Sequence, residues 1–304
     1  MKCKITVFTP TYNRESLLPR LFESLKKQKE TCFEWLIIDD DSSDNTEEVV
    51  NQMMLENVEF SIRYYRQEHG GKHRAINKAL QLARGEYFFI VDSDDFITDN
   101  AVALISSWID EVGSNENICA VSGLKVSAKG NVWGDKPAFK NQWVDASNFE
   151  RTKYNLWGDK AEVYRTDIMK KFPFPEFDGE FFVTEAVCWD RIAAEGYKIR
   201  WYNEPIYVCD YLEDGLTQSG ANEFEGHRKN YKGYCYYIKQ CMGIKPVFEK
   251  VTNFREYNKT ARLLKKNIKE RAADLKWNFG DYIIFMYIKM PVFYIGRIIW
   301  KLFM

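Results

Sequence analysis

The chain has 304 residues, of which 45% are hydrophobic, 29% charged and 16% aromatic. These values are typical of a globular protein with a large core, and they exclude a disordered chain, a collagen and a small disulfide-rich protein. The formal net charge of −1 gives no overall indication of nucleic-acid binding.

The first 125 residues alternate between strand and helix patterns. Apolar, β-rich runs predict strands at 5–8, 35–38, 62–65, 87–91 and 118–122. Helical spacing of apolar residues, with capping residues and glycines at the ends, predicts helices at 17–25, 43–54, 76–83 and 100–112. This alternation indicates an α/β fold with a doubly wound, mostly parallel sheet, which binds ligands at the carboxyl ends of its strands.

The following region, from about 123 to 211, is less regular and rich in aromatic residues. A helix is expected at 184–195, and two strand-like runs follow at 198–201 and 205–211. From Lys250 onward the pattern is helical.

Two clusters of acidic residues come directly after predicted strands. They are Asp39-Asp40-Asp41-Ser42 and Asp92-Ser93-Asp94-Asp95. Carboxylates at positions i and i+2 suit Mg²⁺ or Mn²⁺ that carries a diphosphate. Helix capping alone is the alternative, although a cap needs only one acid.

A third motif, Gly70-Gly71-Lys72, opens a predicted helix. The backbone N–H groups and the helix dipole at such a position can meet an anion. The alternative interpretation is a tight turn followed by a surface lysine. The glycine fingerprints of the common nucleotide-binding loops are not present in the sequence.

Three segments in this order carry a family resemblance: Thr9-Pro10-Thr11-Tyr12-Asn13-Arg14, the run 38–44, and Gly85-Glu86-Tyr87 leading into 91–95. They resemble family 2 glycosyltransferases with the GT-A fold, of the type that builds bacterial surface polysaccharides. The resemblance implies a nucleoside-diphospho-sugar donor, a divalent metal ion and inversion at the anomeric carbon. From the patterns along the chain we expect a nucleotide-sugar-binding half (1–125), an acceptor-binding and catalytic region (126–245) and a basic, amphipathic helical tail (246–304).

The resemblance also assigns roles to single residues. The residues that it places at the donor are Pro10, Thr11, Tyr12, Asp39, Lys72, Asp92 and Ser93. Asp39 would accept a hydrogen bond from the uracil ring, and Lys72 would lie near the phosphates. Asp92 and Asp94 would hold Mn²⁺ or Mg²⁺, and Asp95 would support their loop. His69 stands where this family commonly has asparagine, so its role stays open.

An inverting transfer needs a base that deprotonates the acceptor hydroxyl. The resemblance places this base at Glu185, preceded by Thr184 where an acid is common. A first-turn glutamate that only favours the helix dipole is the alternative, and Asp178, Glu180 and Asp190 are competing candidates. Two histidines stay open as well, since His227 is either a metal ligand or a surface residue. His73 either caps its helix or faces the phosphates.

Positive charge is concentrated in the last part of the chain. Residues 250–304 contain 12 basic and 4 acidic residues. Within it, Tyr282–Met304 is apolar but too often interrupted by charge to span a membrane. Lys289, Arg297 and Lys301 fall on one helical face, which is typical of a helix that lies on an anionic membrane. Docking on the protein's own core or in a dimer interface is the alternative.

Seven cysteines without a CxxC pair favour reduced, mostly buried thiols. The apolar N-terminal run is too short for a signal peptide. We therefore expect a cytoplasmic protein that lies peripherally on the cytoplasmic face of the membrane.

These observations lead to one expected function and two alternatives. We expect a metal-dependent, inverting glycosyltransferase that moves a sugar from a UDP-sugar to a saccharide or lipid-linked acceptor. A sugar nucleotidyltransferase is the first alternative, although its glycine-rich basic loop is not in the sequence. A non-catalytic sugar-nucleotide-binding scaffold at the membrane is the second. The sequence identifies neither the sugar nor the acceptor, whose recognition we expect from residues 126–182 and 213–220.

Overall fold

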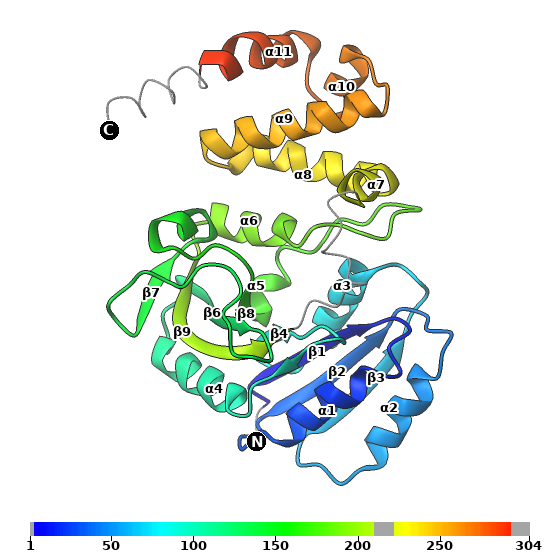
Figure 1. Ribbon diagram of the computed structural model, residues 1–304, viewed down its shortest axis with the longest axis vertical. Coiled ribbons are helices and arrows are strands. Elements are labelled where there is room, and N and C mark those ends of the chain that lie inside the picture. Colours follow the sequence, from blue (N-terminus) through cyan, green and yellow to red (C-terminus); the bar gives the residue numbers. More distant parts are fainter. Residues whose placement is uncertain (1–2, 210–221, 293–304) are drawn as a thin grey trace. The chain divides into compact units, whose positions relative to one another are not determined.

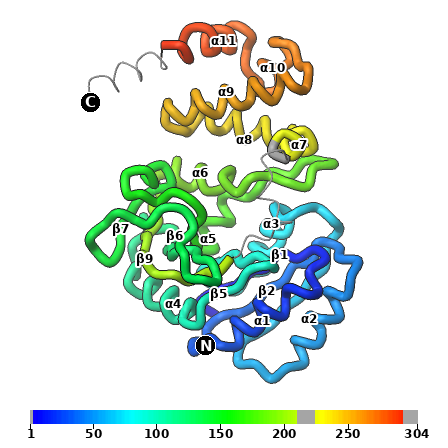
Figure 2. The backbone as a smooth tube through the Cα atoms, in the orientation of Figure 1, coloured from blue at the N-terminus to red at the C-terminus, as the bar shows by residue number. Residues whose placement is uncertain are grey.

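The protein is described here from a computed structural model, and the described residues are 3–209 and 222–292 (Figure 1). The chain divides into two compact units, which are treated one at a time. The first consists of Met1–Phe174 and Cys188–Gln218, and the second of Pro175–Val187 and Ser219–Met304. The yellow-to-red helices of Figure 2 belong to the second unit. The three-part functional division expected from the sequence stays a prediction.

Among the described residues, the first unit forms a nine-stranded sheet. Its strands are β1 (Ile5–Thr11), β2 (Phe33–Asp39), β3 (Ser61–Arg66), β4 (Tyr87–Ile90), β5 (Phe96–Ile97), β6 (Ile118–Val126), β7 (Trp143–Ala146), β8 (Lys160–Arg165) and β9 (Lys198–Val208). The strand order is β3-β2-β1-β4-β8-β6-β9-β5, and β7 pairs with β9 beside this path.

The sheet is parallel in its first half and mixed in its second. Strands β3, β2, β1 and β4 are all parallel, as the alternation of strands and helices predicts. Strand β8 lies between β4 and β6 and is antiparallel to both. Strands β5 and β7 are antiparallel to β9, whereas β6 and β9 are parallel.

Helices cover the faces of this sheet. They are α1 (Leu18–Lys26), α2 (Thr46–Leu55), α3 (Lys72–Leu82), α4 (Ala101–Val112), α5 (Thr166–Met169) and the 3₁₀ segment η1 (Asn148–Tyr154), and α6 (Ala186–Ala194) continues from the second unit into the first. Helix α1 buries Leu18, Leu21, Phe22 and Leu25, the residues whose spacing predicts it. The Phe22 ring stacks on Trp35 of β2 with ring centroids 5.8 Å apart.

The five expected strands of the first 125 residues are confirmed as β1, β2, β3, β4 and β6. The two runs expected at 198–201 and 205–211 form one strand, β9, as far as Val208, and Tyr211 lies outside the described residues. Strand β8 is not predicted by the sequence, because its sequence KAEVYR mixes charged with apolar residues. Its position between β4 and β6 nevertheless completes the centre of the sheet.

Between residues 222 and 292 the second unit is mainly helical. It contains α7 (Asn222–Lys229), α8 (Tyr231–Ile244), α9 (Val247–Leu263), α10 (Ile268–Asp274), α11 (Phe279–Ile284) and the π-helical segment η2 (Phe285–Lys289). Its core joins side chains from α8 to η2, among them Ile238, Phe254, Tyr257 and Leu275. The helical pattern expected from Lys250 onward is therefore confirmed up to residue 292.

The segment from Tyr282, which the sequence predicts to lie on a membrane, is in part a core element. Tyr282 is fully buried and Met286 nearly so, and both belong to the core of the second unit. The Tyr282 hydroxyl also donates a hydrogen bond to Asn258 Oδ1. One face of this segment thus docks on the protein's own core, as the alternative interpretation has it. Arg297 and Lys301 of the expected basic stripe lie outside the described residues.

Candidate functional site

The donor residues expected from the sequence emerge at one edge of the sheet. Thr11, the last residue of β1, is paired in register with Asp39, the last residue of β2. Strand β4 pairs with β1 up to Ile90, so Asp92 emerges at the same edge two residues later. Pro10 precedes Thr11 on β1 and is half-buried. The carboxyl edge of such a sheet is where α/β proteins bind ligands.

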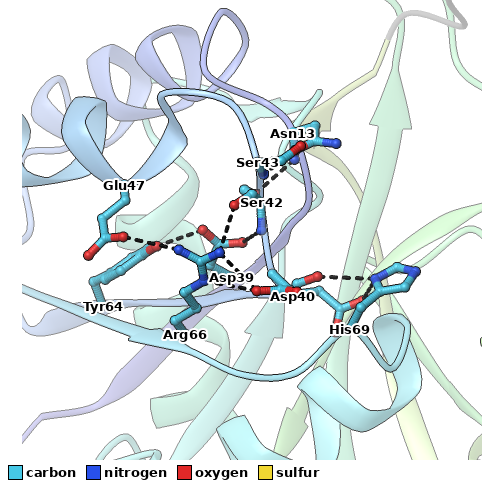
Figure 3. Close-up of polar contacts among 10 residues, drawn as sticks. Asn13, Asp39, Asp40, Ser42, Ser43, Glu47, Tyr64, Arg66 and His69 are labelled. Atoms are coloured by element: carbon cyan, nitrogen blue, oxygen red, sulfur yellow. Dashed lines mark hydrogen bonds and ion pairs between the residues drawn. The ribbon is translucent and has the colours of Figure 1, made fainter.

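Asp39 is fully buried, and both of its carboxylate oxygens accept hydrogen bonds (Figure 3). Oδ1 accepts from the Ser42 backbone N–H at 2.8 Å, and Oδ2 accepts from the Tyr64 hydroxyl at 2.6 Å. Burial raises the pKa of Tyr64 and the carboxylate raises it further, so the tyrosine remains a donor. Because a carboxylate has about four acceptor positions, Asp39 can still accept a bond from a ligand.

Asp40 has a structural role that corrects the expected anion-binding loop. Its Oδ1 accepts from the Gly70 backbone N–H at 2.9 Å, and its Oδ2 accepts from the Gly71 backbone N–H at 2.7 Å. The anion that meets these N–H groups is therefore the protein's own carboxylate. Gly71 has a φ of 88°, a conformation that a glycine adopts without strain. The interpretation as a tight turn holds for these two glycines, while Lys72 points elsewhere, as described below.

An aromatic pair lies beside Thr11. The Tyr12 side chain is 45% exposed, and its ring stacks on the His69 imidazole with centroids 4.5 Å apart. His69 Nδ1 lies 2.9 Å from Asp40 Oδ2, which fixes the ring (Figure 3). The Thr11 hydroxyl is buried and has no hydrogen-bond partner among the described residues. An exposed flat ring can stack on a nucleobase, and a buried polar group beside it can form a hydrogen bond with the nucleoside.

Hydrogen bonds tie the loop after β1 to the loop after β2. The Asn13 backbone N–H donates to Ser42 Oγ at 2.9 Å, and Asn13 Oδ1 accepts from the Ser43 backbone N–H at 2.8 Å (Figure 3). Asp41 forms an ion pair with Arg66 at 2.8 Å. Asp44, outside this cluster, accepts from the Thr46 backbone N–H at the start of α2. Each acid of the first cluster therefore has its own partner, and helix capping does not explain the cluster.

Lys72, the first residue of α3, points at the second acidic cluster. Its Nζ lies 2.6 Å from Asp92 Oδ1. Burial alone would raise the pKa of Asp92, but the charges of Lys72 and Lys125 outweigh it and hold that pKa below its ordinary value. Asp92 is therefore ionised at neutral pH, as a ligand for a cation must be.

Sequence reasoning does not predict two residues in the next layer of the site, Lys125 and Tyr207, which lie near Asp95. Lys125 Nζ lies 4.3 Å from the centre of the Tyr207 ring. Burial would lower the pKa of Lys125, but the charge of Asp92 opposes it and the pKa is raised. The Tyr207 hydroxyl donates to Asp95 Oδ2 at 2.7 Å, which confirms that the Asp95 side chain is tied to the fold. A lone lysine at the end of the apolar strand β6 is the signal that could indicate this residue.

Burial raises the pKa of Asp95 to about 7, and the charges of Asp92 and Asp94 add to this effect. The Asp92 backbone N–H donates to the Tyr207 hydroxyl oxygen at 3.1 Å, and an Arg20 guanidinium N–H donates to the Asp94 carbonyl. These contacts fix the backbone of the acidic loop from both sides. Ser93, between the two acids, is buried.

The residues present fit a divalent metal ion that is shared with a substrate. Asp92 and Asp94 offer hard oxygen ligands, and the described residues contain no group of three or more His, Cys, Asp or Glu side chains that could hold a metal. Mg²⁺ in proteins is commonly held by one or two carboxylates together with substrate phosphates and water.

Glu185 belongs to the second unit. It is half-buried and immediately precedes α6. Thr184 organises this turn, because its hydroxyl accepts from the Ala186 N–H at 3.4 Å and its carbonyl from the Val187 N–H at 3.1 Å. Glu185 stands at the start of a helix, where a negative charge is stabilised.

The competing acids differ from Glu185 in burial. Glu180 is buried and accepts from the backbone N–H groups of Lys232 at 2.7 Å and Gly233 at 2.8 Å, so it caps α8. Asp190 is fully buried, and its Oδ1 accepts from Asn148 Nδ2 at 2.9 Å. Asp178 is exposed. Glu185 and Asp178 are therefore the two of these acids that solvent can reach.

The two histidines with open roles are packed against the protein. His73, the second residue of α3, is buried. The His227 ring stacks on Tyr234 with centroids 3.8 Å apart. All seven cysteines are thiols, and five of them are buried, as the odd count without a CxxC pair predicts.

Comparison with known proteins identifies the class of the chain. Residues 6–168, more than half of it, match the family model described as Glycosyl transferase family 2. The chain belongs to this family. The family resemblance of the sequence motifs and the expected α/β GT-A fold are thus confirmed.

Individual relatives agree with this class. The chain is 30% identical over 178 residues to the poly(ribitol-phosphate) beta-N-acetylglucosaminyltransferase TarS of Staphylococcus aureus, covering 57% of this chain and 30% of TarS. It is 26% identical over 198 residues to the GalNAc(5)-diNAcBac-PP-undecaprenol beta-1,3-glucosyltransferase of Campylobacter jejuni, covering 63% of this chain and 60% of that protein. The matches thus span about a third and about three fifths of these relatives.

Solved structures show the same fold. TarS residues 1–349 in complex with UDP-GlcNAc superimpose with a TM-score of 0.61 at 21% identity, covering 92% of this chain and 81% of that chain. The mannosyltransferase PcManGT of Pyrobaculum calidifontis, in complex with GDP-Man and Mn²⁺, gives a TM-score of 0.55 at 17% identity, covering 95% and 82%. The likeness extends over nearly the whole chain.

Proposed function

We propose that the protein transfers a sugar from a nucleoside-diphospho-sugar, specifically a UDP-sugar, to a saccharide or lipid-linked acceptor. The observation that carries this proposal is the meeting of Lys72 and Lys125 at Asp92, on the sheet edge that also holds Asp39. Two cations suit a diphosphate, and a buried acceptor such as Asp39 suits the N–H of a pyrimidine ring. Relatives whose names contain N-acetylglucosaminyltransferase or undecaprenol support the donor and acceptor classes.

The donor side would work by stabilising the leaving nucleoside diphosphate. Tyr12 and His69 would stack on the base, and Thr11 would contact the nucleoside through its buried hydroxyl. Lys72 and Lys125 would offset the charge that develops on the diphosphate. Mn²⁺ or Mg²⁺ held by Asp92 and Asp94 would supply further charge neutralisation when bound.

The acceptor side would work through a general base. Glu185 would take the proton from the acceptor hydroxyl as that oxygen attacks the anomeric carbon, and the reaction would invert the configuration there. Its half-buried position at the start of α6 supports this role over that of Glu180 or Asp190, whose carboxylates are buried in structural hydrogen bonds.

A donor screen tests this function. The protein is incubated with a panel of UDP- and GDP-sugars and Mn²⁺ or Mg²⁺, and release of nucleoside diphosphate is measured. We expect release from one UDP-sugar, and loss of that release in EDTA and in Asp94→Ala. Full activity in excess EDTA would contradict the metal dependence.

The same screen separates the two alternatives. Release of pyrophosphate instead of nucleoside diphosphate would identify a sugar nucleotidyltransferase. Tight binding of an intact donor without transfer or hydrolysis would favour a non-catalytic scaffold. The family to which the chain belongs and the two lysines near Asp92 favour a transferase over both alternatives.

A further inference from the structure

A groove in the second unit contains none of the residues assigned to the donor or to the base. It has a volume of about 860 Å³ and is lined by side chains of α9 and by residues of η2 and the turn after it. Small-molecule sites commonly have volumes of roughly 300–1,000 Å³, so the groove is much larger than an inorganic ion requires.

One wall of the groove is basic. Arg255, Lys259 and Arg262 line it at positions i, i+4 and i+7 of α9, which places them on one helical face. None of its lining residues, all within the described part of the chain, is acidic. Lys259 forms an exposed ion pair with Glu256 at 3.6 Å, a contact that is weak in water. This wall therefore attracts anions.

Apart from Asn258, the rest of the groove is apolar. Leu263, Met286 and Met290 line it, and Met286 also belongs to the core beneath. Methionine side chains are flexible and adapt to irregular apolar ligands. A bare phosphate or a nucleotide would leave this part of the groove unused, whereas an anion that carries an aliphatic chain would contact both parts.

An exposed apolar face follows directly along the chain. Ile284, Tyr287, Ile288 and Val292 are 43–61% exposed, and their spacing puts them on the side of α11 and η2 away from the buried Tyr282. A contiguous apolar face of this kind marks an interaction surface, and tyrosine is common where membranes meet water. In residues 3–209 and 222–292 we find no helix that is long and apolar enough to span a membrane.

We infer that α9, α11 and η2 form a binding surface for the phosphate headgroups of anionic lipids in a bilayer. Arg255, Lys259 and Arg262 hold headgroup phosphates, and the exposed face at Ile284 and Ile288 enters the boundary between headgroups and acyl chains. The charge of the groove and the adjacent apolar face both fit this occupant. Membrane binding by these elements does not depend on the proposed sugar transfer, and it can be measured without any turnover.

Co-sedimentation of the full chain with vesicles tests the inference. The vesicles contain phosphatidylcholine alone or with phosphatidylglycerol. We expect binding to the anionic vesicles only. A single basic residue contributes a factor of about five to such binding, so the triple variant Arg255→Gln, Lys259→Gln, Arg262→Gln should bind on the order of a hundredfold more weakly.

A matched control separates a site from general charge. The triple variant Lys265→Gln, Lys269→Gln, Lys276→Gln removes the same charge from exposed positions of the same unit that do not line the groove. It should bind much more tightly than the groove variant, and both should unfold at the wild-type temperature. Ile284→Ser with Ile288→Ser should weaken the binding that remains at high salt, because burial of apolar surface is not screened.

Each of the following results would overturn the inference. The first is no binding of wild-type protein to anionic vesicles, and the second is equal loss in the groove and control variants. The third is a dimer in sedimentation velocity that the Ile284→Ser, Ile288→Ser variant dissolves while vesicle binding is unaffected, since the apolar face would then bind a second copy. Competition by inorganic phosphate to completion would assign the groove to a free anion instead of a lipid.

Discussion

Single residues at the donor edge are positioned by partners from distant parts of the chain. Lys72 belongs to α3 and Lys125 to β6, and both act on the pKa of Asp92 after β4. Because folding fixes these charges in advance, the proposed binding of a diphosphate would need little reorganisation. The same holds for Asp39, whose orientation is set by Ser42 and Tyr64.

Asp39→Ala should weaken UDP binding by about 1.5–3 kcal/mol, the usual contribution of a hydrogen bond to a charged group. Isothermal titration calorimetry measures this directly. Tyr64→Phe is the matched control, because it removes one hydrogen bond to Asp39 but keeps the carboxylate, and it should cost less. An unchanged UDP affinity in Asp39→Ala would show that this carboxylate only supports its loop.

The sequence could predict which acids reach the sheet edge, because Asp39 and Asp92 directly follow recognisable strands. It could not predict what each acid contacts. The partner of the Gly70 and Gly71 N–H groups is Asp40, about thirty positions earlier in the chain. Lys125 was missed for the same reason, since its relation to Asp92 exists only in the folded sheet.

The N-terminus of α8 is capped by the buried carboxylate of Glu180. Glu180→Ala should lower the free energy of unfolding by about 1–2 kcal/mol, because the first N–H groups of α8 lose their acceptor. Urea unfolding followed by circular dichroism provides the measurement. Asp178→Ala, a nearby exposed acid, serves as the control and should stay within about 0.5 kcal/mol of wild type. Equal effects of the two changes would refute the capping role.

The segment that begins at Tyr282 is a core element. Tyr282→Ala should destabilise the protein by about 3–5 kcal/mol, as for other large aromatic residues in cores. Tyr282→Phe keeps the packing and loses only the hydrogen bond to Asn258, so it should cost about 1 kcal/mol. Thermal unfolding of both variants checks the order, and a stable Tyr282→Ala variant would mean that the segment is peripheral after all.

Element prediction succeeds where the sequence pattern is strong and local. Strands β1, β2 and β4 are buried apolar runs, and α1 has a clear apolar face. Strand β8 cannot be predicted in this way, because its charged residues interrupt the apolar pattern. Pairing with β4 and β6 stabilises it in the folded sheet. The tail from Tyr282 reads as amphipathic in the sequence, but the sequence does not say whether lipid or protein covers its apolar face.

At the scale of the whole molecule, the proposed roles in binding and catalysis are divided between the two units. The residues proposed to bind the donor, from Pro10 to Lys125, belong to the first unit, whereas the proposed base Glu185 and the basic groove on α9 belong to the second. This division predicts that donor binding and acceptor activation can be separated by mutation. It also predicts that membrane binding can be lost without loss of donor binding.

The most direct test of this account is Glu185→Gln, measured by two quantities. The variant keeps the size of the side chain but cannot accept a proton, so kcat for sugar transfer should fall by a factor of about 10²–10⁴. The dissociation constant for UDP in the presence of Mn²⁺ should stay at the wild-type value, because a base that acts on the acceptor hydroxyl is not expected to bind the nucleotide. If Glu185→Gln retains more than about a tenth of the wild-type kcat, a smaller loss than removal of a general base causes, the assignment is contradicted and Asp178 is the next acid to change.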